Sequence, residues 1–400
     1  MTIINNYSAF DGIHWETGST HNFFKARGFN NPHTGAPYSE PFLLGVSGGI
    51  VFGYFSFAYD GWDPILALLS RNTFDPMDKM LSRLGVMQNI KQSTKADKAL
   101  KNLQEMLDSG TPAVAWIDIF NTSYVGSSEH EGIPGMEPVV VYGWEDGKVH
   151  LADRATQGFV ISEEEFVAAL GRVKKFKHRM ATYEAPDESK LASAATAGIW
   201  DTINLFTEKP PKGSKNNFGF AAYQNWIKLL TKPKTRLSWE KEFPRGVKLY
   251  AGLRDMFTRT STFGQIQGGA DRRPYADFLR EAASMLNKPA LNQVADQFLH
   301  SADEWEKLTS IGLSDDVPLL AEARSLLSQK SSILRAGGSD TGETLTNLNN
   351  RLKEIRDTCD TDFPMSQEEV EGLRGQLAAQ VQVIHDVEFE AIAVLKDAMG

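Results

Sequence analysis

The chain has 400 residues, which is too long for one small domain and suits two. Its hydrophobic fraction of 41% and charged fraction of 23% are ordinary for a globular protein and exclude a mainly disordered or collagen-like chain. A formal net charge of −9 argues against nucleic-acid binding, and a single cysteine excludes disulfide scaffolds and cysteine-rich zinc sites.

The first part of the chain mixes helix and strand signals. A helix-like run extends to Gly28, and an amphipathic pattern predicts a helix over residues 95–107. Ser162 is expected to cap a third helix with an acidic first turn. Strands are predicted over residues 112–120, 138–144, 149–152 and 175–183, with Asp146-Gly147 as a hairpin turn.

The second part is expected to be almost wholly helical. Its eight predicted helices cover residues 189–206, 218–230, 247–258, 275–286, 289–308, 318–337, 341–359 and 366–399. We therefore predict an α+β domain over residues 1–185, followed by a helical domain over residues 186–400. Tyr275, Phe278 and Trp305 stand at helical spacing and are expected in the helical core.

Glycines, aromatic residues and residues with reactive side chains are most concentrated between Phe10 and Phe57. The glycine-rich segment 45–53 has neither the lysine of a Walker motif nor the spacing of a Rossmann motif. Close backbone packing is therefore a better explanation of these glycines than phosphate binding.

Several linked motifs resemble the butirosin biosynthesis protein H family. Residues 14–17 (HWET) match its His-Cys-Glu-Ser/Thr start, and residues 39–45 (SEPFLLG) and 48–55 (GGIVFGYF) match its two following segments. Residues 137–145 (EPVVVYGWE) and 151–154 (LADR) resemble its later strand motifs. Residues 268–283 (GGADRRPYADFLREAA) resemble the helical domain that follows in such proteins.

The resemblance implies a fold related to papain-like and C39-type cysteine peptidases, and it implies amide-bond chemistry. The founding activity of the family moves an aminoacyl group from an acyl carrier protein to an aminoglycoside amine. In such a fold the nucleophile lies at a helix N-terminus, a histidine activates it, and an acid orients the histidine.

This sequence departs from the family pattern at both reactive positions. Trp15 stands in place of the cysteine and Glu137 in place of the histidine, while the acid is retained as Asp153. An indole cannot act as a nucleophile or a base. Cys359 lies outside the motifs, and we expect it to be packed on a helix.

The leading hypothesis is an amide-forming acyltransferase without a covalent intermediate. An amine would attack a bound thioester directly, with His14, Glu16 or Glu137 as general base and Asp153 as a further catalytic residue. Its partners would be a small-molecule amine and an acyl carrier protein. Alternatively, a hydroxyl of Thr17, Ser19 or Thr20 replaces the thiol, with His14 or His21 as its base. The predicted substrate-binding residues are Trp15, Thr17, Ser19, Tyr54 and Arg154.

Two other hypotheses remain open. In a ligand-binding or scaffold protein with a degenerate site, Trp15 would fill the site or stack on a ligand. In a metal-dependent enzyme, His14, Glu16 and Glu137 would be ligands, with Asp153 or His130. Simpler interpretations are that His14 and Glu16 fix the first helix, and that Glu137 pairs with Arg154.

Three further expectations concern partners and location. The basic residues between Arg172 and Arg179 would place Lys175, Lys177 and Arg179 on one face of a strand, suited to an acidic carrier protein or to a solvated sheet edge. The apolar helices over residues 315–399 suit a helical cap or a homo-oligomer interface. Residues 1–5 have neither the basic start nor the apolar core that is typical of a signal peptide, and no stretch has the length of an apolar membrane span. We therefore expect a cytoplasmic protein without a cofactor.

Overall fold

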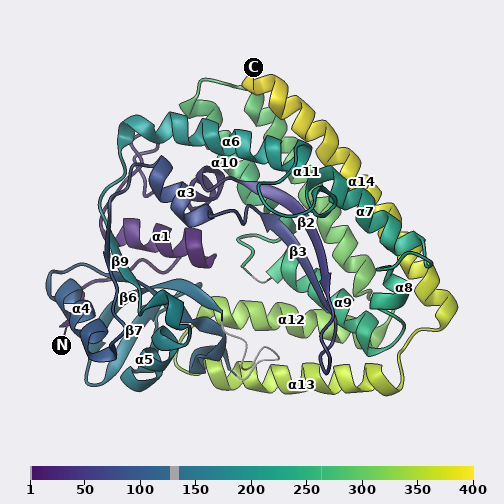
Figure 1. The fold of residues 1–400 in the computed structure, drawn as a ribbon, viewed down its shortest axis with the longest axis horizontal. Coiled ribbons are helices and arrows are strands. Elements are labelled where there is room, and N and C mark those ends of the chain that lie inside the picture. The colour runs from purple at the N-terminus through teal and green to yellow at the C-terminus, as the bar shows by residue number, and fades with distance from the viewer. Residues whose placement is uncertain (1, 127–134, 263) are drawn as a thin grey trace. The chain divides into compact units, whose positions relative to one another are not determined.

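The computed structural model describes residues 2–126, 135–262 and 264–400 (Figure 1). The chain divides into two compact units. Unit 1 comprises Met1–Leu43, Leu81–Leu191 and Gln329–Asn350, and unit 2 comprises Leu44–Met80, Ala192–Ser328 and Arg351–Gly400. One division at 191/192 lies near the predicted boundary at 185/186, but neither unit is a continuous stretch of chain.

Unit 1 is built on an antiparallel sheet with the strand order β4-β9-β5-β6-β7-β8, in which β1 also pairs with β6. The strands are β1 (Thr2–Ile3), β4 (Gln88–Lys91), β5 (Ala113–Asp118), β6 (Met136–Glu145), β7 (Lys148–Ala152), β8 (Phe159–Ser162) and β9 (Met180–Tyr183). The turn between β6 and β7 has Asp146 and Gly147 at φ values of 47° and 70°, which is the left-handed conformation that favours this residue pair.

Helices complete unit 1. They are α1 (Trp15–Ala26), α4 (Ala96–Asp108) and α5 (Glu163–Gly171), with α2 (Glu40–Val46) and α3 (Pro76–Arg83) extending into unit 2. Leu103 of α4 and Phe166 of α5 share a buried core with Val139 and Val141 of β6. On α1, Phe23 contacts Tyr183 of β9 edge to face, with ring centroids 5.0 Å apart.

One predicted strand in unit 1 is partly wrong. Only residues 180–183 of the predicted strand 175–183 form β9, whereas Lys174–Phe176 form a 3₁₀ turn. Lys177 and His178 have φ values of 51° and 47°, which no extended strand permits. The alternating basic face is therefore absent, and Arg179 instead lies over the Trp116 ring at 4.4 Å.

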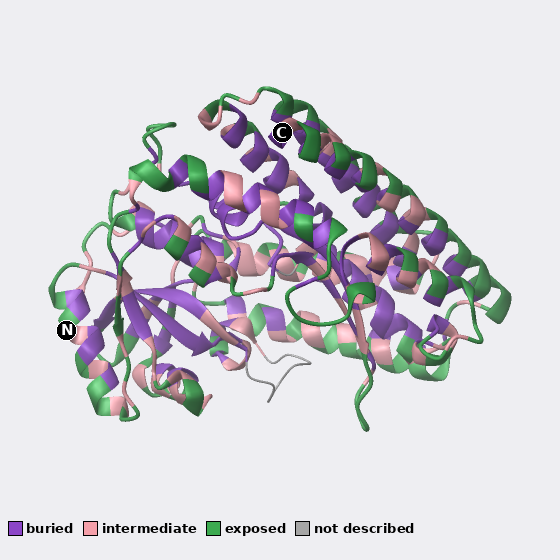
Figure 2. Cartoon of the chain, turned by 45° about the horizontal axis from the view of Figure 1, so that its top comes forward, coloured by how far each residue is buried: buried purple, intermediate pink, exposed green. Residues whose placement is uncertain are grey.

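Unit 2 contains a hairpin of β2 (Ile50–Phe57) and β3 (Ile65–Arg71) together with helices. The helices are α6 (Leu191–Thr207), α7 (Gly219–Thr231), α8 (Trp239–Glu242), α9 (Val247–Phe257), α10 (Arg272–Met285), α11 (Ala290–Gly312), α12 (Pro318–Ala336), α13 (Thr341–Thr361) and α14 (Gln367–Met399), of which α6, α12 and α13 also contribute residues to unit 1. All eight predicted helices are confirmed; α8 was not predicted. Figure 2 shows that the longer helices carry buried stripes along one side.

The predicted packing roles of the glycines, the aromatic residues and the cysteine are confirmed. A Cβ on Gly49 would lie 2.1 Å from the Thr202 hydroxyl oxygen, so only glycine permits this approach. Tyr275, Phe278 and Trp305 are buried in unit 2. Cys359 is buried on α13, and burial raises its pKa to about 11. Within the described part of the chain, no helix is long and apolar enough to cross a membrane.

Candidate functional site

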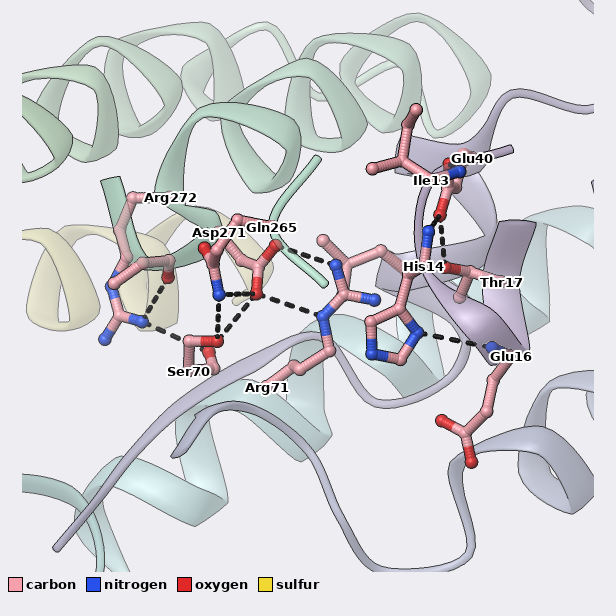
Figure 3. Close-up of polar contacts among 12 residues, drawn as sticks. Ile13, His14, Glu16, Thr17, Glu40, Ser70, Arg71, Gln265, Asp271 and Arg272 are labelled. Carbon is pink, nitrogen blue, oxygen red and sulfur yellow. Dashed lines mark hydrogen bonds and ion pairs between the residues drawn. The ribbon is translucent and has the colours of Figure 1, made fainter. Parts of the chain in front are cut away.

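The first helix begins at the residue that takes the place of the family cysteine. His14 is its N-cap, with extended backbone angles, and the His14 Nδ1 accepts a hydrogen bond from the backbone N–H of Glu16 at 3.3 Å (Figure 3). A ring nitrogen that accepts carries no proton, so the neutral ring has its proton on Nε2. The predicted capping role of His14 is confirmed.

Glu40, the first residue of α2, holds the entry of α1 in place. Its buried carboxylate accepts hydrogen bonds from the backbone N–H groups of Ile13 (2.7 Å) and His14 (2.8 Å) and from the Thr17 hydroxyl (2.8 Å) (Figure 3). An acid at a helix N-terminus also faces the positive end of the helix dipole. Sequence reasoning missed this role, although Glu40 stands in the quoted motif at residues 39–45.

The hydroxyl groups proposed as substitute nucleophiles have structural partners. Thr17 donates to Glu40, whereas Ser19 and Thr20 donate to the backbone carbonyl of Glu16 at 3.2 and 2.8 Å. His21 contacts the Asp11 carboxylate at 3.2 Å through Nε2. These contacts satisfy the three hydroxyls within the fold, and they give no support to a hydroxyl nucleophile.

Trp15 is the first residue of α1 and is partly exposed. Its ring lies against the His14 imidazole, with ring centroids 4.1 Å apart and an angle of 34° between the planes. The indole thus occupies the helix position where the resemblance places a thiolate. This pairing of two flat rings orients both side chains at the start of α1.

Glu137 lies near the beginning of β6, opposite Ile117 of β5. Burial raises its pKa to about 8, the negative charges of Glu16 and Asp153 add to this effect, and the positive charge of Arg154 opposes it. Within residues 2–126, 135–262 and 264–400, no hydrogen bond or ion pair of the Glu137 side chain is found. The predicted ion pair between Glu137 and Arg154 is therefore not observed.

Arg154 instead pairs with its neighbour in the sequence. Its Nε and Nη2 donate to the two carboxylate oxygens of Asp153 at 2.7 Å each, and the Tyr124 hydroxyl donates to Asp153 Oδ2 at 2.9 Å. The φ of 48° at Arg154 turns the chain sharply after β7 and allows this contact between adjacent residues. Asp153 and Arg154 form a buried, paired group whose charges act on Glu137.

Two predicted features do not join this group. Tyr54 belongs to unit 2, where it is buried on β2 and its hydroxyl accepts a hydrogen bond from the Trp239 indole at 3.1 Å. No three His, Cys, Asp or Glu side chains in the described residues lie together in a way that could hold a metal ion. The site residues therefore give the metal hypothesis no donor set, and His130 lies outside the described residues.

Unit 2 has a buried polar cluster of its own, which Figure 3 shows in part. The Asp271 carboxylate accepts from Arg71 (2.7 and 3.0 Å), from the Ser70 hydroxyl (2.6 Å) and from Gln265 (3.1 Å). Arg272 pairs with Glu388 at 2.7 Å, and both side chains are fully buried. Every one of these carboxylates is matched by donors, which is typical of a structural network.

Comparison with known families gives two successive matches. Residues 14–154 match the N-terminal domain of butirosin biosynthesis protein H, and residues 167–316 match a domain of unknown function, DUF4872. The first match begins at the N-cap of α1 and ends at Arg154, so it spans the whole group around Glu137. No curated protein matches the chain. The two matches together cover most of the sequence, and the chain belongs to the butirosin biosynthesis protein H family, with its N-terminal domain followed by a helical C-terminal region.

Proposed function

We propose that this protein is a biosynthetic acyltransferase that forms an amide between an acyl or aminoacyl thioester and an amine, with Glu137 as the general base. The family name places the relatives in a biosynthetic pathway. The residues at the two reactive positions of the family motif, Trp15 and Glu137, exclude a Cys–His pair and favour direct transfer.

The observation that carries the proposal is the raised pKa of Glu137. An ordinary glutamate is too weak a base to take a proton from an amine, whereas a carboxyl group with a pKa of about 8 is close to the operating range. Burial and the neighbouring charge of Glu16 are the means by which enzymes tune such groups.

The proposed step balances without a co-reactant. The amine nitrogen forms a bond to the thioester carbonyl carbon, Glu137 accepts the proton that the nitrogen loses, and the carbon–sulfur bond breaks to release a thiolate. The proton on Glu137 then passes to the thiolate, which restores the carboxylate.

Turnover of an acyl pantetheine thioester with a panel of amines tests this proposal. We expect Glu137→Gln to lower kcat/KM by about 10²–10⁴-fold, because it removes the base but keeps the shape of the side chain. The matched control is Glu164→Gln, an exposed acid on α5 that should leave turnover unchanged. Wild-type kcat/KM should rise as the pH passes about 8. Full turnover of Glu137→Gln would refute the assignment of the base.

A ligand-binding role without turnover is the second candidate, and the ring pair of His14 and Trp15 favours it. A flat aromatic surface at the start of α1, where Glu16 carries a negative charge that acts on Glu137, suits a cationic amine. Calorimetric titration with the same amines should then show binding that Trp15→Ala weakens and Trp15→Phe largely retains. Binding of equal strength in both variants would remove this candidate.

A further inference from the structure

The segment Gln329–Asn350 belongs to unit 1, although it is far along the chain from the rest of that unit. It comprises the end of α12, the connection over residues 337–340 and the start of α13. It also lies outside the regions that match the two family models. We call this segment the α12–α13 corner.

The corner supports the loop that follows Arg154. The backbone N–H of Thr156 donates to the carbonyl of Arg335 at 2.7 Å, and the Thr156 hydroxyl donates to the carbonyl of Ala336 at 3.3 Å. A Cβ on Gly337 would lie 2.8 Å from the carbonyl oxygen of Gln157. The two backbones are therefore in direct contact, two to three residues after the Asp153–Arg154 pair.

The corner also supports the turn that carries Tyr124. A Cβ on Gly342 would lie 2.1 Å from the carbonyl oxygen of Ser123, and a Cβ on Gly126 would lie 2.7 Å from the carbonyl oxygen of Gly342. Tyr124 donates to Asp153, so the corner contacts both the turn that carries the donor and the loop three residues after the acceptor. Leu334 packs against the buried core of the sheet and fixes the corner there.

Arg335 connects the corner electrostatically with the entry of α1. Burial lowers the pKa of the Arg335 guanidinium, and the negative charge of Glu40 acts against this effect. A buried carboxylate is stable only with compensating donors or charge, and Glu40 is the acid that binds the N–H groups of Ile13 and His14.

We infer that the α12–α13 corner is a positioning element of the candidate site, in which Gly342 holds the Tyr124 turn and the backbone of residues 335–337 holds the loop after Arg154. The corner thus holds Tyr124 against Asp153, one of the charges that act on Glu137, without touching a substrate. The expected effect of the corner on turnover rests on the proposed function, whereas its effect on hydrogen exchange within the site does not.

Hydrogen exchange read by mass spectrometry on the full chain tests the inference without any substrate. We expect Gly342→Ala to speed exchange at residues 122–126 and 153–157 by about tenfold or more, because the new methyl group displaces the Ser123 backbone. Gly372→Ala is the matched control, since no described residue outside the local turn of α14 lies within 4 Å of a Cβ at that glycine.

Gly337 gives a second, independent arm in case Gly342→Ala does not fold. Gly337→Ala should speed exchange at residues 153–157 by about tenfold, because its Cβ would lie 2.8 Å from the carbonyl oxygen of Gln157 and a φ of 71° favours glycine. Wild-type exchange at residues 122–126 and 153–157 in folded variants would overturn the inference.

The outcomes separate the two proposals. If exchange changes as expected but the wild type transfers no acyl group, the positioning role stands and the proposed function fails. If the variants exchange and turn over like the wild type, the proposed function stands and the positioning role fails. If both hold, the pH at which kcat/KM rises should shift in Gly342→Ala and stay at the wild-type value in Gly372→Ala.

Discussion

Two glutamates, one in each unit, have pKa values shifted in opposite directions: Glu388 in unit 2 is fully buried, and Glu137 in unit 1 is half-buried. In unit 2 the Glu388 carboxylate accepts hydrogen bonds from Arg272 (2.7 and 3.1 Å), Tyr223 (2.7 Å), Ser301 (2.7 Å) and Trp305 (3.1 Å). Burial alone would raise the pKa of Glu388, but the charge and hydrogen bonds of Arg272 outweigh it, and the pKa is lowered. In unit 1 burial and two acidic neighbours raise the pKa of Glu137 to about 8.

The difference lies in the supply of donors. Glu388 has a partner for each oxygen and is held as an anion, so its ionisation is fixed and its role is to connect α14 with α7, α10 and α11. Arg154, the cation that acts on Glu137, is already paired with Asp153. Among the described residues Glu137 has no such partner, and a half-buried acid in that environment can change its protonation near neutral pH, which is a property of reactive sites.

The largest expected effect comes from removing the partner of Glu388. Arg272→Met should lower the free energy of unfolding by about 3–5 kcal/mol, because it leaves a buried carboxylate without its counter-charge. The measurement is urea unfolding followed by circular dichroism. Arg280→Met is the matched control on the same helix, where an exposed arginine pairs with Asp296 and the loss should stay within about 1 kcal/mol. Equal losses in both variants would remove the contrast between buried and exposed pairs.

An intermediate effect is expected in the pH dependence of stability. The pKa of Glu137 is about 8 in the folded chain and about 4.3 in an unfolded one, so the folded state binds more protons between these values. The stability that this group contributes is therefore complete below pH about 4 and is lost as the pH rises through about 8.

Comparison of wild type with Glu137→Gln isolates this contribution, because the amide does not titrate. The urea midpoint of the wild type should fall relative to that of the variant between pH 5 and pH 9. A difference between the two midpoints that stays constant over this range would show that Glu137 has an ordinary pKa.

The smallest effect is expected at Cys359. Burial raises its thiol pKa to about 11, so the thiolate needed for attack is scarce at neutral pH. The native protein should react slowly with a disulfide reagent such as dithiobis-nitrobenzoate and rapidly once unfolded in urea. Cys359→Ala should leave acyl transfer unchanged; a loss of turnover with intact folding would reinstate a thiol mechanism.

The helices of the second half could be predicted from the sequence almost to their ends. Apolar residues at helical spacing, together with breaks such as Gly268-Gly269, define them locally. The strand predicted over residues 175–183 was partly wrong, because alternating polarity there reflects a turn in which Lys177 and His178 adopt left-handed angles. That conformation depends on packing, not on the pattern of residues.

The sequence predicts which residues belong to the candidate site but not how they are arranged in space. Sequence motifs pointed to His14, Trp15, Glu16, Glu137 and Asp153, and the capping role of His14 follows from its place before a helix. The same reasoning placed Tyr54 with them, although β2 carries it into the core of unit 2. A motif contains residues that are close together in the sequence. The burial of each of these residues, however, depends on which strand or helix packs over it.

The sequence by itself determined the family, the helices, and the replacement of a Cys–His pair by Trp15 and Glu137. Only the tertiary structure decided that the pKa of Glu137 is raised and that Arg154 pairs with Asp153. It also decided that residues 329–350 belong to the first unit, where they contact the loop after Arg154 and the turn of Tyr124. The physical reason is distance. Local structure follows from neighbouring residues, whereas the charge state of a buried acid depends on groups that only folding brings within range.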